Sequence, residues 1–217
     1  MTESRKEIAL EQRENHEARL FSPSAARNRD PIREAFLKYM PDTGVIVEVG
    51  SGTGEHVVHI ARALPGVHFR PGDPDAASRE SIAAWTVRLG LKNIDPPHAA
   101  DVASAGWSDE FHSCDGLLSI NMLHIAPFDA ARGLFTGARS LLHAGGRLFL
   151  YGPFSRHGVH TAPSNEAFDA SLKLRNPLWG VRDLEGDILP LAEAALLRLV
   201  AIETMPANNL CVVFEKT

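Results

Sequence analysis

A carboxylate followed by a glycine-rich turn gives this 217-residue sequence its clearest chemical signal. Residues 45–56 read VIVEVGSGTGEH, in which Glu48 precedes a turn that consists of Gly50, Ser51, Gly52, Thr53 and Gly54. Glycines let the backbone turn sharply and approach a ligand without a Cβ in the way. The G-x-G-x-G spacing is not the G-x-G-x-x-G of a dinucleotide site, and the Lys-Ser/Thr of a phosphate-binding P-loop is missing. Because Glu48 would repel a diphosphate, the stretch favours a cationic, amine-bearing ligand.

The turn lies between a predicted strand and a predicted helix. The β-branched run at 45–49 is typical of a buried strand in a parallel sheet, and residues 56–64 carry apolar side chains at helical spacing. A strand, a glycine turn and a helix in this order form the first unit of a nucleotide-binding α/β fold, with the helix N-terminus facing the loop. The alternative is a turn that only connects the strand to the helix.

A second carboxylate follows the next predicted strand. Residues 67–70 form a short strand that leads to Asp73, at about the 20-residue distance from the glycine turn at which such folds place a ribose-binding carboxylate. A carboxylate can accept hydrogen bonds from both ribose hydroxyls at once. The alternative is that Asp73 caps the helix predicted over 76–89.

A third predicted strand would add an adenine-binding segment. Residues 94–100 lead to Asp101 and Val102, where a carboxylate can accept a hydrogen bond from the exocyclic amine and the next backbone N–H can donate to the ring. Pro96 and Pro97 interrupt this strand, because proline donates no hydrogen bond to a sheet. The adenine-binding prediction for Asp101 therefore depends on a poorly formed strand.

Polar side chains also follow the fourth and fifth predicted strands. The strand at 115–120 is followed by Asn121 and His124, and the strand at 147–151 ends at Tyr151. In open α/β sheets, ligands bind beyond the carboxyl ends of the strands. We therefore predict that these three residues are catalytic and share a crevice with the glycine turn. A histidine that only packs in the core or caps a helix is the alternative for His124.

An irregular segment at 152–187 follows the fifth strand and is rich in His, Arg, Asn and Pro. A loop-rich insertion at the ligand-binding edge of a sheet is typical of a lid or a substrate pocket. A helix is predicted within it, from residue 165 or 166 to 174. The residues predicted to line the substrate pocket are Phe154, Arg156, His157, His160 and Trp179. We predict no metal, because no Asp, Glu or Cys completes a ligand set with the two histidines at a recognisable spacing.

The ends of the chain complete the predicted organisation. Residues 1–20 mix both charge signs, which indicates a solvated helix or a partly ordered arm. A polar loop at 27–29 precedes a helix that Asp30 would cap and that runs to Tyr39. The other predicted elements are helices at 128–142 and 183–196 and antiparallel strands at 197–205 and 210–215. The prediction is one α/β domain over 21–217, with helices on both faces of a Rossmann-like, seven-stranded, mostly parallel sheet whose C-terminal strand is antiparallel.

The composition is that of an ordinary globular domain, with 44% hydrophobic and 23% charged residues. The net charge of −5 gives no sign of an electrostatic nucleic-acid binder. Cys114 and Cys211 have no disulfide or zinc spacing, which favours buried thiols in a reducing compartment. No apolar stretch reaches the roughly 18 residues of a membrane span. We expect a cytoplasmic protein with no membrane or nucleic-acid partner. The sequence is compatible with a monomer or a homodimer.

Several longer segments resemble the DUF938 family of methyltransferase-like proteins. They are SPSAARNRDPI, EVGSGTGEH, INMLHIAPF, LYGPF, SNEAFDASL, RNPLWGVRDLE and MPANNL. The resemblance covers nearly everything after residue 20. It implies the class I methyltransferase fold and S-adenosylmethionine as the cofactor. It also implies that the loop around Arg27 and Asn28 covers the ligands, with Asn28 at the cofactor and Arg27 at the substrate. It supplies no substrate.

Two functional hypotheses follow. In the first, the protein is a methyltransferase for a small-molecule acceptor. Cofactor contacts would then come from Asn28, Glu48, Gly50, Ser51, Gly52, Gly54, Asp73, Asp101, Val102 and Asn121. Methyl transfer is an in-line displacement, so alignment supplies most of the catalysis, and a base is needed only if the acceptor must lose a proton. In the second hypothesis, the protein keeps the fold without the chemistry and acts as a binding or regulatory partner.

Overall fold

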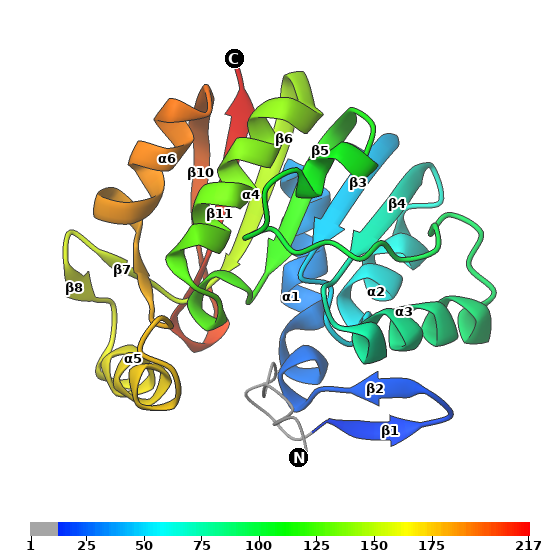
Figure 1. The fold of residues 1–217 in the computed structure, drawn as a ribbon, viewed down its shortest axis with the longest axis horizontal. Coiled ribbons are helices and arrows are strands. Elements are labelled where there is room, and N and C mark those ends of the chain that lie inside the picture. The colour runs from blue at the N-terminus through cyan, green and yellow to red at the C-terminus, as the bar shows by residue number, and fades with distance from the viewer. Residues whose placement is uncertain (1–12) are drawn as a thin grey trace.

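Six strands form the central sheet of the computed structural model, which describes residues 13–217. They are β3 (Gly44–Val49), β4 (Val67–Gly72), β5 (Cys114–Ile120), β6 (Leu142–Gly152), β10 (Leu197–Met205) and β11 (Asn209–Lys216). Their order is β10-β11-β6-β5-β3-β4 (Figure 1). β3, β4, β5 and β6 are parallel, whereas β11 is antiparallel to both β6 and β10. The predicted α/β fold and its antiparallel C-terminal hairpin are confirmed.

The predicted number of strands, seven, is wrong by one. The segment predicted as the third strand runs beside β4 but pairs with it only at two isolated bridges, Phe69 with Ile94 and Gly72 with His98. Pro96 and Pro97 lie between these bridges and have no N–H to donate, so a continuous ladder cannot form there. The segment still reaches the carboxyl end of β4, where Asp101 follows it.

Helices cover both faces of the sheet. The helices are α1 (Pro23–Tyr39), α2 (Glu55–Ala63), α3 (Ala76–Leu89), α4 (Phe128–Leu141), α5 (Pro163–Arg175) and α6 (Leu189–Ala194). Alternate residues of a strand face opposite sides of a sheet. Val47 accordingly packs with α4 and α6 in one core cluster, and Ile46 packs with α1, α2 and α3 in the other. In Figure 1, α4 lies in front of the sheet and α1 behind it.

The helix predicted from Asp30 begins earlier, at Pro23. Ser22 caps it by accepting a hydrogen bond from the Ala25 N–H at 3.3 Å, and proline occupies its first position. Ser22-Pro23 and Asp30-Pro31 are both helix-start signals, and the first of them is used. The polar loop predicted at 27–29 is therefore helical, and Arg27 and Asn28 project from the first turns of α1.

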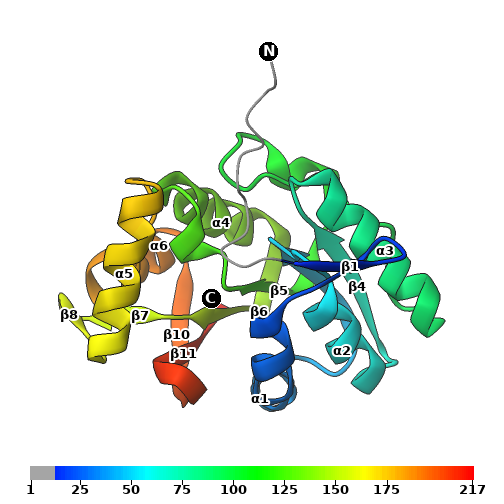
Figure 2. The same cartoon turned by 90° about the horizontal axis from the view of Figure 1, so that it is seen from below.

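Two smaller elements lie beyond the carboxyl ends of the parallel strands, the edge that Figure 2 faces. β1 (Glu14–His16) and β2 (Arg19–Phe21) form a hairpin, where a helix or arm was predicted for residues 1–20. Residues 1–12 of that prediction lie outside the described part of the chain. On the other side of the edge, β7 (Phe154–Arg156), β8 (Val159–His160) and β9 (Arg182–Asp183) form a small sheet next to α5. The helix predicted within 152–187 is confirmed as α5.

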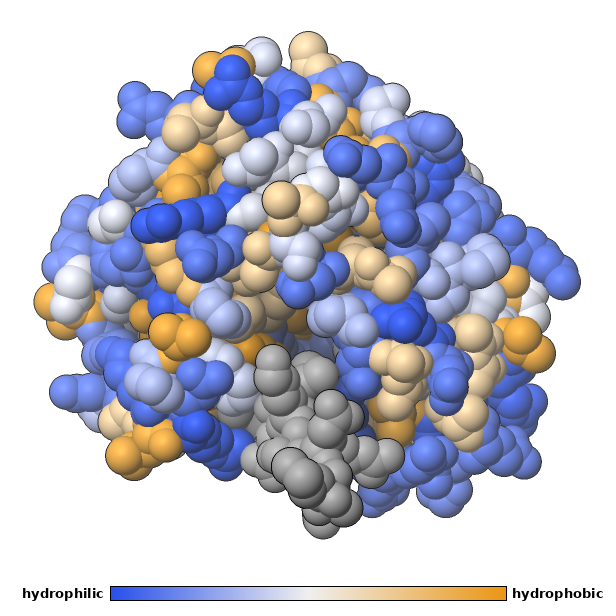
Figure 3. Space-filling model, viewed as in Figure 1, coloured by the Kyte–Doolittle hydropathy of each residue, from blue (hydrophilic) through white to orange (hydrophobic). Residues whose placement is uncertain are grey.

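Exposed apolar residues are scattered over the face drawn in Figure 3. The most exposed large apolar side chains of the described chain are Val87 on α3 and Leu174 on α5. Between residues 13 and 217, no helix combines the length and the apolar character needed to cross a bilayer.

Candidate active site

The glycine turn and Asp73 meet at the carboxyl edge of the sheet. β3 ends at Val49, just before the turn, and β4 ends at Gly72, just before Asp73. The Gly52 N–H donates to Asp73 Oδ2 at 2.8 Å, and the Ser51 N–H donates to the Gly72 carbonyl at 3.2 Å. Two segments that lie 21 residues apart are thus joined directly, as the parallel pairing of β3 and β4 requires.

The three glycines of the turn have different surroundings, although all have positive φ angles. A Cβ on Gly54 would lie 2.9 Å from the Ile82 Cα, so this glycine lets α2 approach α3. A Cβ on Gly50 would lie 3.0 Å from the Met122 side chain. Among the described residues, a Cβ on Gly52 would meet no atom closer than Arg13 Nη2, at 3.6 Å. Close packing within the described chain therefore explains Gly54 and Gly50 but not Gly52.

Glu48 is a buried carboxylate whose Oε2 atom has no hydrogen-bond partner among the described residues. Burial raises the pKa of Glu48 to about 8, a hydrogen bond from Ser51 opposes that rise, and the nearby charge of Asp73 adds to it. Burying an unpaired carboxylate is costly, so such groups usually have a ligand or a catalytic role. The residue fits the predicted contact with an amine.

Asp73 is buried, and its carboxylate is held by two backbone donors. Besides the Gly52 N–H, the Asp75 N–H donates to it at 2.9 Å, and burial outweighs both bonds and raises the pKa of Asp73. The alternative prediction, that Asp73 caps α3, is wrong. Asp75 caps that helix by accepting a hydrogen bond from the Ser78 N–H at 2.9 Å. Because Asp75 caps α3, the carboxylate of Asp73 can have another role beside the glycine turn.

The predicted adenine segment lies against α4. A Cβ on Gly133 would come within 1.7 Å of the Val102 carbonyl oxygen, so α4 packs directly on this backbone. Asp101 is exposed and closes a local turn, accepting hydrogen bonds from the Ala103 N–H at 3.0 Å and the Ser104 hydroxyl at 3.1 Å. An adenine contact by Asp101 stays a prediction, and it would have to be made alongside these two bonds.

A partly buried network links Asn28 to Tyr151. Asn28 Oδ1 lies 2.9 Å from His56 Nε2, and the Asn28 side chain also hydrogen-bonds the Tyr151 hydroxyl. Asn209 Nδ2 donates to the same hydroxyl at 3.1 Å. Burial lowers the pKa of His56 to about 4 and raises that of Tyr151, so both side chains are neutral near pH 7. His56 and Asn209 were not among the predicted site residues, although both lie in segments of the family resemblance, EVGSGTGEH and MPANNL.

Asn121 and His124 lie together beside the end of β6. Asn121 has a φ angle of 56°, and its N–H donates to the Tyr151 carbonyl at 2.8 Å. A Cβ on Gly152 would be 3.5 Å from His124 Nδ1 and 3.8 Å from Asn121 Oδ1, so both side chains face this glycine. His124 is buried, with its ring edge-on to Phe168 at a centroid distance of 5.5 Å.

His124 is neutral at physiological pH. Burial lowers its pKa to about 3, and the positive charge of Arg182 contributes to the shift. A neutral imidazole can accept or donate a hydrogen bond, but it is a weak proton acceptor at this pKa. His124 is therefore suited to orienting a bound group by a hydrogen bond rather than to acting as a general base.

Arg182 holds the segment that carries His124. Its Nε donates to the Leu123 carbonyl at 3.1 Å and its Nη2 to the Ala126 carbonyl at 2.7 Å, one on each side of the histidine. The Gly180 N–H donates to the His124 carbonyl at 3.0 Å. Arg182 lies in the segment RNPLWGVRDLE and is one of the polar residues of 152–187, but it was not among the predicted site residues.

Replacing Arg182 by methionine is expected to lower the free energy of unfolding by about 2 kcal/mol, because carbonyl groups lose a charged donor. The pKa of His124 should rise, since the nearby positive charge is removed. Denaturant unfolding and an NMR titration of the imidazole measure the two effects. Arg88→Met, at the exposed end of α3, is the control. An unchanged His124 titration would contradict the electrostatic part of this assignment.

The residues predicted for the substrate pocket are only partly brought together. The prediction that Phe154 lines the pocket is wrong. Its side chain packs in the hydrophobic core, because β7 turns it inward. Arg156 forms an ion pair with Glu185 at 2.6 Å, and the exposed His157 lies 3.7 Å from the same carboxylate. In this structure, Arg156 and His157 therefore contact Glu185 next to the small sheet.

The other predicted pocket residues are spread around the edge. His160 Nε2 lies 3.5 Å from Asp169 Oδ2, and His160 also borders a pocket of about 360 Å³ at the start of α5. Trp179 is half-buried next to Gly180, and Arg27 is exposed on α1. The described residues contain no group of three His, Cys, Asp or Glu side chains that could hold a metal ion.

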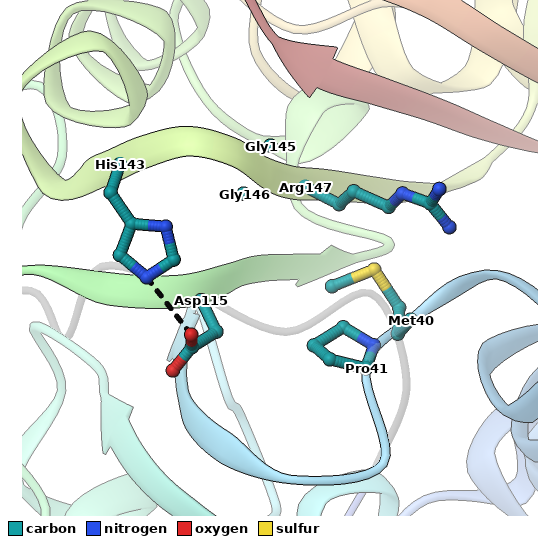
Figure 4. A pocket seen from close by; sticks show the side chains of 7 residues that line it. All are labelled: Met40, Pro41, Asp115, His143, Gly145, Gly146 and Arg147. Carbon is teal, nitrogen blue, oxygen red and sulfur yellow. Dashed lines mark hydrogen bonds and ion pairs between the residues drawn. The ribbon is translucent and has the colours of Figure 1, made fainter.

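A second pocket, of about 220 Å³, lies at the opposite edge of the sheet (Figure 4). Its polar side chains already have partners within the protein. His143 Nε2 lies 2.9 Å from Asp115 Oδ1, and Asp115 Oδ2 accepts a hydrogen bond from the Val45 N–H at 2.7 Å. Arg147, which also lines it, pairs with Glu215 at 3.0 Å. This pocket shows no unsatisfied polar group comparable with Glu48, which lies near the carboxyl edge.

Solved structures of methyltransferases share this fold. An O-methyltransferase family 2 protein from Planctomyces limnophilus, in complex with apigenin, superposes with a TM-score of 0.73 at 20% identity, covering 89% of this chain and 60% of that one. An O-methyltransferase family protein from Burkholderia thailandensis gives 0.75 at 14% identity, covering 89% and 56%. CalO1, a methyltransferase in calicheamicin biosynthesis in its SAH-bound form, gives 0.68 at 19% identity, covering 89% and 54%.

These matches define the class of fold as that of the class I methyltransferases. This chain spans a little over half the length of the proteins compared. The family is identified separately. The model described as "Protein of unknown function (DUF938)" matches residues 19–216, so the chain belongs to the DUF938 family.

Proposed function

We propose that the protein is an S-adenosylmethionine-dependent methyltransferase that acts on a small-molecule acceptor. The observation that carries the proposal is the glycine turn together with the two carboxyl groups that flank it. The Oε2 atom of buried Glu48 has no hydrogen-bond partner among the described residues, and Asp73 accepts a hydrogen bond from the Gly52 N–H. The fold of CalO1 in its SAH-bound form supports the choice of cofactor.

The residues at this edge fit the parts of such a cofactor. The carboxyl group of Glu48 would ionise beside the ammonium group, because a nearby opposite charge favours the charged form. Gly52 lets the backbone come close to the ligand. Asp73 can accept hydrogen bonds from the ribose hydroxyls, because each carboxylate oxygen has a second lone pair. Val102 would offer its backbone to adenine. Asn28, on α1, would cover the same site.

The acceptor side of the site would be formed by Asn121, His124 and Tyr151. It lies toward α5, whose Phe168 contacts His124. When bound, the cofactor supplies an electrophilic methyl group, so the protein has mainly to align the acceptor. Neutral His124 and the Asn121 amide can hydrogen-bond a hydroxyl or amine and exclude water around it. We propose that residues 152–187 close this side. The apigenin-bound relative supports a small acceptor.

Calorimetric titration with S-adenosylhomocysteine tests the cofactor site. We expect micromolar binding by the wild type and a loss of roughly 10- to 100-fold in Asp73→Ala, because hydrogen bonds to a charged group are lost. The matched control is Asp75→Ala, which removes the neighbouring carboxylate that caps α3. It should lower the free energy of unfolding by about 1 kcal/mol and leave the affinity nearly unchanged.

Two outcomes would contradict the proposal. Equal affinity of Asp73→Ala and the wild type would rule out the ribose contact. No binding by folded wild-type protein would favour the second hypothesis, a partner protein without chemistry. After a positive titration, transfer of a labelled methyl group to a panel of metabolites identifies the acceptor.

A further inference from the structure

The N-terminal hairpin is fastened to α3 beside the glycine turn. The Leu20 N–H donates to the Ser81 hydroxyl at 2.8 Å, and the Trp85 Nε1–H donates to the Leu20 carbonyl at 3.1 Å. The Ser81 hydroxyl in turn donates to the Thr53 carbonyl of the turn at 2.7 Å. The Phe21 ring contacts the Trp85 ring edge-on, at a centroid distance of 4.9 Å.

A buried carboxylate makes a second connection between the hairpin and the turn. Glu55 Oε2 accepts a hydrogen bond from the Ser22 N–H at 2.7 Å and one from the Thr53 hydroxyl at 3.0 Å. Ser22 directly follows β2, so the hairpin, the start of α1 and the glycine turn are held in one arrangement. The hairpin is therefore built into the carboxyl edge of the sheet (Figure 2).

This arrangement brings Arg13 to the glycine turn. Arg13 Nη1 donates to the Ser78 hydroxyl at 3.1 Å, and Nη2 is the atom nearest to the position of a Cβ on Gly52. Burial raises the pKa of both Asp73 and Glu55, and the charge of Arg13 opposes that rise. A guanidinium thus lies beside Gly52, the glycine of the turn at which a Cβ would meet no atom of the described residues within 3.5 Å.

We propose that Arg13 is a cofactor-binding residue that pairs with the α-carboxylate at the amino-acid end of the ligand; this inference rests on the proposed function. The carboxyl groups of Glu48, Glu55 and Asp73 also lie at the turn, and each of them would repel that group when ionised. S-Adenosylmethionine and S-adenosylhomocysteine carry a single anionic group, the carboxylate, and a guanidinium binds carboxylates through paired hydrogen bonds. A purely structural role, in which Arg13 only balances Asp73, is the competing explanation.

Two ligands that differ at the amino-acid end distinguish these explanations. S-Adenosylhomocysteine carries the carboxylate, and 5′-methylthioadenosine keeps the adenosine and the thioether but lacks the amino-acid group. In Arg13→Gln we expect affinity for the first ligand to fall roughly 10- to 100-fold, with affinity for the second unchanged. Arg62→Gln, on the exposed end of α2, makes the same change in net charge and should alter neither affinity.

The titrations use the full chain, and thermal unfolding of each variant checks that it is folded. Equal weakening of both ligands in Arg13→Gln would overturn the carboxylate assignment, because a structural role would affect the adenosine end as well. Unchanged affinity for S-adenosylhomocysteine would also overturn it. If the wild type bound neither ligand, the proposed function would fail, which is a different result from a failure of Arg13 alone.

Discussion

Replacing Gly52 by alanine is expected to abolish detectable binding of S-adenosylhomocysteine while lowering the free energy of unfolding by only about 1–2 kcal/mol. The stability cost comes from the φ angle of 57°, which places a side chain in the left-handed region. The new methyl group would meet no atom of residues 13–217 within 3.5 Å, and alanine keeps the N–H that binds Asp73. A large loss of affinity would therefore be caused by a steric clash between the ligand and the methyl group of alanine.

Gly90→Ala is the matched control for this experiment. Gly90 ends α3 with a φ angle of 64°, and a Cβ there would have no atom within 4 Å. The two variants share the same backbone strain, so chemical denaturation should show similar losses of stability. Calorimetric titration should then separate them. If Gly52→Ala bound the ligand as tightly as Gly90→Ala, the turn would be only a structural connection between β3 and α2.

Replacing Glu48 by glutamine is expected to stabilise the protein and to weaken the cofactor site. The folded-state pKa of Glu48 is raised from 4.5 to about 8. The wild type therefore loses stability as the pH rises through this range, because the carboxyl ionises in the unfolded chain while the buried carboxyl stays protonated. Glutamine cannot ionise. Its melting temperature should therefore exceed that of the wild type at pH 8 to 9, and the difference should shrink toward pH 4.5.

The same variant should bind S-adenosylhomocysteine roughly tenfold more weakly or worse, because the ammonium group would lose its anionic partner. Thermal unfolding from pH 4.5 to 9 and calorimetry at pH 8 measure the two effects. Glu80→Gln, on the exposed side of α3, is the control and should keep the pH profile of the wild type. Parallel pH profiles for Glu48→Gln and the wild type would contradict the burial argument, and equal affinities would exclude the ammonium contact.

Much of the fold could be predicted because its signals are local. The strand, glycine turn and helix around Glu48 follow one another within 20 residues of sequence. Asp73 follows the next strand, and parallel pairing then places it beside the turn. The C-terminal hairpin likewise depends on neighbouring segments. Two predictions failed where local signals conflict: two Ser/Asp-Pro pairs compete for the start of α1, and two prolines interrupt the predicted third strand.

The sequence by itself determined the class of fold, the glycine turn and the carboxylates that flank it. Only the tertiary structure decided which glycines of the turn are closely packed, which residues hold His124 and where Arg13 lies. The reason is distance along the chain: Arg13 contacts Ser78 across 65 positions, Arg182 contacts Leu123 across 59, and Asn209 contacts Tyr151 across 58. Such contacts form because the carboxyl ends of parallel strands meet at one edge of the sheet, and no spacing pattern within a segment encodes them.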